Sequence, residues 1–447
     1  MRRLSATLLV CLAGCLAQSL TGAAQEEAKP TALGGKPFFI KQTWTIGGEG
    51  NWDYLTLDPI ALQLFVAHGT SVQVVDVNAG ALVGQVTGMR DAHGIALDDS
   101  GALGFVSDGP SNEVRIFDRR SLQVVASVPT GPNPRAIVYE PLTKLVFAVC
   151  TQPVDETFET ASGQASGPAS GQAASQTSNQ NTRRNAGRAG GGSQASANNS
   201  IVRSVVTVID SESHLALANL LLPGKLGFAQ TDGRGEVFVN IVDRNRIAHF
   251  DAQTVLSQIP RPAAHAADGQ PPDVPVIDWS GAPTQSGQPV ENRLHIFRLG
   301  AACQNPVGLA VDGQRLRLFA ACNNQKMEVL NSETGDVVTT LTIGAGTDAI
   351  GYDATRGLIY TSNGGGLGSL TIIRQDVTDS YAVIQELPTR QRARTLAVNP
   401  VSGEVYLVTN LQGFDLNKKG EGGSTYTLPV VQATPVSGSF QVLVIGN

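Results

Sequence analysis

The chain has 447 residues, a formal net charge of -6 and 16% charged residues. A net acidic chain has no general attraction to phosphate backbones, so the composition argues against a nucleic-acid-binding protein. Its 49 glycines and 23 prolines, with few charges, favour many short strands joined by tight turns over long charged helices.

The first 24 residues have the features of an export signal. A charged start at residues 1–3 precedes an apolar run at residues 8–16 that is short for a membrane span. We assign residues 1–24 to the signal and residues 25–37, which are polar and rich in small side chains, to a flexible tether. No later segment reaches the roughly 18 apolar residues that a membrane helix needs, so no transmembrane segment is expected.

Two processing sites are compatible with this signal. Residues 22–24 (GAA) suit ordinary signal peptidase, whereas residues 12–15 (LAGC) resemble the lipobox of bacterial lipoproteins. The second reading would leave a lipid anchor on Cys15. Both readings place the mature protein in the periplasm, at the cell surface or in the medium.

One pattern recurs seven times along the chain, an apolar alternation that ends in a carboxylate or its amide, as in YLTLD and GLAVD. A second strand, a third strand and usually a fourth follow each occurrence. Four of the six intervals between successive ends are 40 to 46 residues, which matches the propeller-blade period of about 40 to 50. The seven ends are Asp58, Asp98, Glu140, Asp232, Asp312, Asp353 and Asn399.

The sequence therefore predicts an all-β fold, a single seven-bladed β-propeller over residues 38–447. The two longer intervals hold insertions instead of further blades. Residues 152–203 have almost no large apolar side chains and are predicted to be disordered, and residues 257–292 are Pro-rich and irregular. A third insertion spans residues 412–434. Because the last blade ends with its third strand, the N-terminal strand at residues 38–46 is expected to complete it and close the ring.

These residues resemble the YVTN family of β-propeller repeat proteins, whose name is nearly spelled out by VYLVTN at residues 405–410 and echoed by the strand V-x-V-I-D. The resemblance covers the chain from residue 38 to the C-terminus apart from the insertions. It implies a secreted or cell-surface propeller. Members and their relatives range from binding proteins to enzyme subunits, so the resemblance implies little about function.

The mouth of the channel can be located by counting along the repeat. The first strand of each blade starts, and the second ends, on one face of the disk, and the residue five positions before each repeat end marks that face. Five of the seven such residues are charged or titratable and form a contiguous arc over blades 6, 7, 1, 2 and 3. The arc comprises Asp348, Arg394, Asp53, His93 and Arg135, and Gly227 and Val307 complete the ring.

We expect this arc to bind a ligand, with Arg135 and Arg394 orienting an anionic group, because a guanidinium binds a carboxylate through two parallel hydrogen bonds. The alternative is that both arginines only neutralise Asp53 and Asp348. Arg119 is expected on a turn at the opposite face and serves as a comparison.

The leading function is a non-catalytic binding or scaffold propeller for a small-molecule or protein partner, because the sequence has no nucleophile elbow, phosphate loop or dinucleotide fingerprint. One alternative is a metal-assisted lyase or lactonase, similar to virginiamycin B lyase or regucalcin, with a divalent ion in the channel. The weak candidate ligands are His68, His93 and Asp108, which lack a compact metal-binding spacing. A further alternative is a subunit of a periplasmic redox complex, although the chain has no haem or quinone motif.

Two cysteines are expected to form a disulfide. Cys303 lies nine residues before Asp312 and Cys322 ten after it, so the hairpin of blade 5 brings them together. An oxidising compartment permits the bond. Cys150 holds the place of Cys322 in its own blade, but its partner position is Gly131, so a free, buried thiol is expected.

Overall fold

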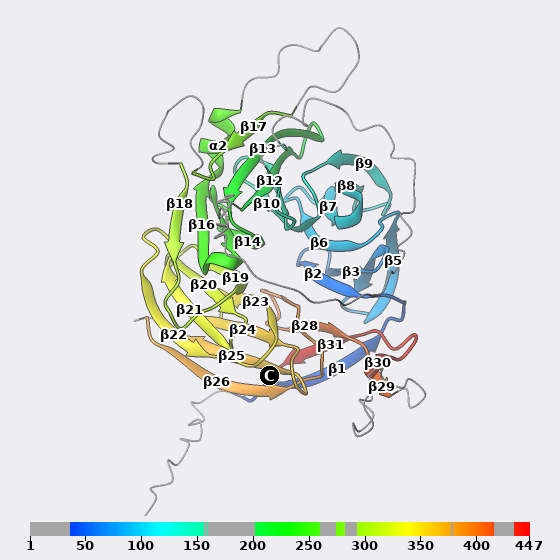
Figure 1. Cartoon of the computed structure of the whole chain (residues 1–447). Coiled ribbons are helices and arrows are strands. Elements are labelled where there is room, and N and C mark those ends of the chain that lie inside the picture. The colour runs from blue at the N-terminus through cyan, green and yellow to red at the C-terminus, as the bar shows by residue number, and fades with distance from the viewer. Residues whose placement is uncertain are drawn as a thin grey trace, which may run out of the picture.

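Seven sheets of four or five strands, antiparallel except for one added strand in blade 3, stand in a ring in the described part of the chain (Figure 1). The predicted seven-bladed β-propeller is therefore confirmed. The export signal with Cys15, nearly all of the tether and most of the three insertions lie outside the described residues. The computed structural model describes residues 36–155, 158, 202–259, 274–281, 293–376, 379–414 and 433–447.

The first three blades begin with strands β2, β6 and β10, each of which lies nearest the channel. Blade 1 comprises β2 (Trp52–Asp58), β3 (Gln63–His68), β4 (Ser71–Asp76) and β5 (Ala81–Thr87). Blade 2 comprises β6 (Ala92–Leu97), β7 (Leu103–Asp108), β8 (Glu113–Asp118) and β9 (Val124–Pro129), with the short helix η1 (Gly109–Ser111). Blade 3 comprises β10 (Pro134–Glu140), β11 (Leu145–Cys150), β12 (Arg203–Asp210), β13 (Leu215–Pro223) and β17 (Val276–Asp278).

Blades 4 to 6 follow the same order from channel to rim. Blade 4 comprises β14 (Leu226–Thr231), β15 (Glu236–Ile241), β16 (Arg246–Asp251) and β18 (His295–Arg298), with helices η2 (Val242–Arg244) and α2 (Ala252–Gln258). Blade 5 comprises β19 (Pro306–Asp312), β20 (Arg317–Cys322), β21 (Lys326–Asn331) and β22 (Val337–Thr342). Blade 6 comprises β23 (Thr347–Asp353), β24 (Leu358–Asn363), β25 (Ser369–Gln375) and β26 (Tyr381–Pro388).

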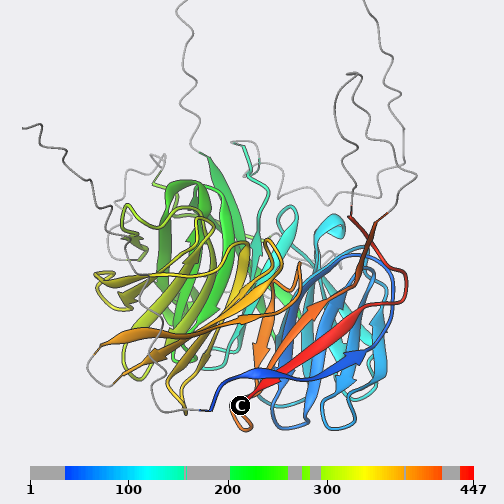
Figure 2. The same cartoon turned by 90° about the horizontal axis from the view of Figure 1, so that it is seen from below.

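Blade 7 joins the two ends of the chain. Its strands are β27 (Leu396–Val398), β28 (Val405–Thr409), β31 (Gln441–Gly446) and β1 (Phe39–Thr45), in that order outward. Figure 2 shows β1, in blue, running alongside β31, in red, and the two are antiparallel with Phe39 opposite Gly446. The predicted closure is confirmed. It removes an exposed edge from β31, whose residues are all buried.

The residue that ends a repeat caps the turn that follows, which is why the sequence repeats it; Asp98 of blade 2 differs and accepts from the Leu103 N–H, five residues on. Asp58 Oδ1 accepts hydrogen bonds from the backbone N–H of Ile60 at 2.9 Å and of Ala61 at 3.0 Å. Asn399 Oδ1 accepts from the two equivalent N–H groups of blade 7. A side-chain oxygen that bonds the backbone two and three residues on stabilises a tight turn.

The core lies between neighbouring blades. Alternate residues of each strand face the next blade, as where Phe65 of blade 1 packs on Phe117 of blade 2 with ring centroids 5.9 Å apart. Burial of such side chains contributes about 1.5–3 kcal/mol each. The rigid ring holds the starts of the innermost strands in place around the channel.

The insertion at residues 257–292 is less irregular than expected. Residues Val276–Asp278 form β17, which pairs in parallel with the outer strand β13, and the adjoining Trp279 is buried against blades 3 and 4. The prediction was wrong at this point because three residues show no alternation, and the pairing partner is more than 50 positions away in the chain.

The insertion at residues 152–203 ends one residue earlier than predicted. Arg203 is the first residue of β12, forms an isolated bridge with Val154, and its guanidinium lies 3.2 Å from Asp278 Oδ2. Within the third insertion, β29 (Gln412–Phe414) pairs with β30 (Ala433–Pro435). The insertions at residues 152–203 and 412–434 therefore both leave the disk from paired backbone segments.

The cysteines are arranged as predicted. Cys303 and Cys322 form a disulfide with their Cα atoms 5.4 Å apart, and Cys322 lies opposite Pro306 in the blade 5 hairpin. Cys150 is free and fully buried, and burial raises the pKa of its thiol to about 12, so the group is inert.

Candidate ligand site at the channel mouth

The predicted mouth residues lie where the innermost strands are irregular. In blades 1 to 6 the pairing of the first two strands slips by a bulge at the start of the first strand, and the bulge contains the residue that counting had selected. In blade 1 the bulge lies between Trp52 and Leu55 and holds Asp53. A bulge turns a side chain away from its regular direction, which lets these residues reach the channel.

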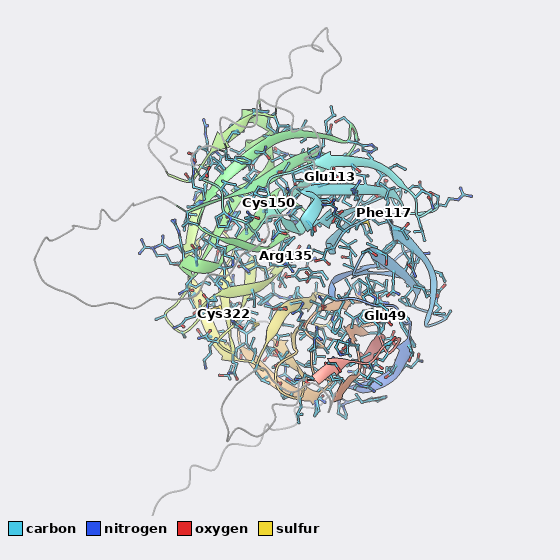
Figure 3. All side chains as sticks on the ribbon, turned by 45° about the vertical axis from the view of Figure 1, so that its right-hand side comes forward. Glu49, Glu113, Phe117, Arg135, Cys150 and Cys322 are labelled. Carbon is cyan, nitrogen blue, oxygen red and sulfur yellow. A yellow bond between two sulfur atoms is a disulfide. The ribbon has the colours of Figure 1, made fainter. Side chains whose placement is uncertain are left out.

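A cavity of about 230 Å³ occupies this mouth. Six of the seven positions selected by counting line it, and His93 is the exception. Arg135 lies close to the centre of the ring (Figure 3). The six are Asp53, Arg135, Gly227, Val307, Asp348 and Arg394, joined by Tyr54, Ala136, Thr151, Phe228, Val242 and Pro306.

Asp53 is the buried anchor of one half of the site. Its Oδ2 atom lies 2.8 Å from His93 Nδ1 and accepts a hydrogen bond from Arg135 Nη2 at 3.0 Å. Burial raises the pKa of the Asp53 carboxyl, but the hydrogen bond from His93 and the charge of Arg135 outweigh it and leave the pKa below its usual value. Asp53 is thus stabilised as an anion, and its Oδ2 atom holds Arg135 in place.

His93 supports the site from behind. Its ring is almost fully buried, its Nδ1 faces Asp53, and its Nε2 lies 3.5 Å from Asp91 Oδ2 and close under Gly109. Both ring nitrogens face protein groups, and His93 does not line the cavity. Its contact with a ligand stays a prediction, and in the structure it contacts Asp53.

Asp348 and Arg394 form the other half. Arg394 Nε lies 3.0 Å from Asp348 Oδ2, and Arg394 Nη2 reaches the Trp52 carbonyl at 3.5 Å. Burial raises the pKa of the Asp348 carboxyl above its usual value, and the charge of Arg394 offsets this only in part. The two aspartates of the mouth therefore differ: Asp53 is stabilised as an anion, and Asp348 is not.

Two aromatic residues that sequence reasoning missed form the floor. The rings of Tyr54 and Phe228 lie 4.9 Å apart, and both residues line the mouth and also a second cavity of about 330 Å³ deeper in the channel. Burial, with the charges of Asp53 and Asp348, raises the pKa of the Tyr54 hydroxyl, so it stays protonated. The sequence does mark these two residues, because YLTLD and FAQTD are the only two of the seven repeats that begin with an aromatic residue.

The three candidate metal ligands do not converge. His68 Nδ1 lies 2.9 Å from Gln73 Oε1. Asp108 accepts hydrogen bonds from the backbone N–H groups of Arg90 and Asp91, and His93 faces Asp53. Among the residues that the structure describes, no group of three or more His, Cys, Asp or Glu side chains could hold a metal ion.

No protein-family model and no curated protein matches the sequence. The resemblance to YVTN repeat proteins therefore stays a prediction. In the described part of the chain, no helix has the length and apolar character to cross a membrane.

Solved structures share the fold. Hydrazine synthase of Kuenenia stuttgartiensis is 13% identical with a TM-score of 0.53, over 83% of this chain and 95% of that one. The WD40 repeats of RRP9 are 8% identical with a TM-score of 0.56, over 90% and 96%. A chain of the mitotic checkpoint complex is 12% identical with a TM-score of 0.54, over 88% and 95%. At such identities the likeness shows a β-propeller and carries no activity.

Proposed function

We propose that the protein is an exported, non-catalytic β-propeller that binds an anionic group of a small ligand or protein partner at the channel mouth. The observation that carries the proposal is the pair of arginines at the cavity. The side chains of Arg135 and Arg394 are 43% and 39% exposed, and each is held from behind by an aspartate. Guanidinium groups fixed in this way bind carboxylate or phosphate with little further loss of side-chain freedom.

Two further observations support the proposal. The disulfide in blade 5 suits a compartment that is not reducing, as does the apolar segment near the N-terminus. Similar folds include WD40 repeats and a chain of a checkpoint complex, which agrees with a propeller that serves as a binding scaffold.

Replacing Arg394 with alanine is expected to weaken binding by about 1.5–3 kcal/mol, because one charge-assisted contact is lost. The same change at Arg135 should have a similar effect. Isothermal titration calorimetry of the mature protein against a panel of small carboxylates and phosphate esters identifies a ligand and then measures both variants.

Arg120→Ala is the matched control for these variants. Arg120 is exposed on the turn between β8 and β9, at the opposite face, whereas its neighbour Arg119 is buried and unsuitable. If the Arg135→Ala, Arg394→Ala double variant binds the identified ligand as tightly as the unchanged protein, the mouth is not the site and these arginines only balance the aspartates.

A further inference from the structure

The mouth presents both signs of charge. Asp348, 35% exposed, faces the cavity beside Arg135 and Arg394, whereas the Asp53 carboxylate is only 10% exposed and already bonded twice. A ligand therefore meets two cations and one anion. This pattern is unfavourable for a ligand that carries negative charge alone, because its anionic group would approach the Asp348 carboxylate.

Both the cationic and the anionic side chains at the mouth can form further hydrogen bonds. Among the described residues, Arg135 makes one side-chain contact, through Nη2 to Asp53, and Asp348 makes one, through Oδ2 to Arg394. The second oxygen of Asp348 and the remaining guanidinium N–H groups are therefore available. Asp348 can therefore accept a hydrogen bond from a ligand cation while its Oδ2 atom stays paired with Arg394, and a charge-assisted hydrogen bond of this kind is a strong one.

The floor is suited to a cation as well. Tyr54 and Phe228 line the cavity, and a cation within about 6 Å of an aromatic face is attracted by it. Tyr54 lines the same cavity as Asp348 and Arg394. A cationic group that contacts Asp348 would thus lie beside the aromatic floor.

We propose that the ligand is a small zwitterion that bears an ammonium and a carboxylate group, such as a free amino acid. Its carboxylate binds Arg135 and Arg394, and its ammonium group binds the second oxygen of Asp348, whose Oδ2 atom stays paired with Arg394. The mouth cavity of about 230 Å³ has room for a molecule of this size. This inference rests on the proposed function and names the ligand class of the same site.

The test compares each amino acid with two related compounds, the acid that lacks the ammonium group and the amine that lacks the carboxylate. Alanine, leucine and phenylalanine are titrated by calorimetry against the mature protein, together with the matching acids (propanoate, 4-methylpentanoate, 3-phenylpropanoate) and the matching amines. At least one amino acid is expected to bind about tenfold or more tightly than its acid and its amine, the effect of one further charge-assisted contact.

Asp348→Asn is expected to reduce the preference for the amino acid over its acid to about twofold or less, because the amide carries no charge for the ammonium group. The matched control is Asp243→Asn, which removes the charge of an exposed residue on η2, at the same face, that does not line the cavity. It should retain the preference. Thermal unfolding of both variants checks that they fold.

The outcomes separate this inference from the proposed function. If the acids bind as tightly as the amino acids, the zwitterion is wrong and the anionic site stands. If the preference survives Asp348→Asn, the ammonium group does not contact Asp348 and the inference is also wrong. If no amino acid binds at millimolar concentration while a carboxylate or phosphate ester of the wider panel does, the inference fails alone; if nothing in either panel binds, both fail.

Discussion

Replacing Arg119 with alanine is expected to lower the free energy of unfolding by about 3–5 kcal/mol, the typical loss when one partner of a buried ion pair is removed. Arg119 follows β8 and reaches two carboxylates of neighbouring blades, pairing with Asp58 and lying 3.4 Å from Asp98 Oδ1. All three side chains are less than 10% exposed. Their contacts join blades 1 and 2 at the face opposite the mouth.

The physical reason for so large an effect is the charge left behind. Without Arg119, the Asp58 carboxylate stays buried and bonded only to the turn that it caps. Urea or guanidinium unfolding of Arg119→Ala measures the loss, and Arg120→Ala, on the same turn but exposed, should change stability by less than about 0.5 kcal/mol. Equal stability of the two variants would show that Asp58 and Asp98 are not dependent on the guanidinium.

Removing the disulfide is expected to cost about 3 kcal/mol. The bond between Cys303 and Cys322 spans 19 residues, and the chain-entropy relation assigns about that stabilisation to a loop of this length, since the link restricts the unfolded chain. The measurement is chemical unfolding of the Cys303→Ala, Cys322→Ala variant without reductant.

Reductant provides an internal control for this measurement. It should destabilise the unchanged protein and the Cys150→Ala variant to the same extent, because Cys150 is free, and it should not affect the variant that lacks the bond. Finding the thiols of Cys303 and Cys322 reduced in unfolded mature protein would contradict the prediction.

The two aspartates of the candidate site contribute differently to the stability of the folded protein. Asp53 is ionised, buried and bonded, so it contributes to a fixed geometry. The raised pKa of Asp348 means that the folded protein disfavours its charged form.

The blade count, the closure of the ring and the places of the mouth residues could be read from the chain without a structure. Alternation with a period of two and turn-capping carboxylates act over a few residues, so the sequence carries them directly. Counting five residues back from Asp58 or Asp353 finds the same point of the blade because the innermost strands β2 and β23 have the same length, 7 residues each.

Side-chain direction and partners required the tertiary structure. His93 was placed correctly on the ring, yet its ring faces Asp53, which lies 40 residues away, instead of the cavity. Arg119 looked like an exposed turn charge, but its ionic partners lie 61 and 21 residues away. The contact of Tyr54 with Phe228 joins blades 1 and 4, which are far apart in the sequence. The pairing of β17 with β13 joins a repeat strand to a segment that lacks the repeat pattern. Such contacts exist only once the blades pack around a common axis, and local periodicity contains no information about which side chains then meet.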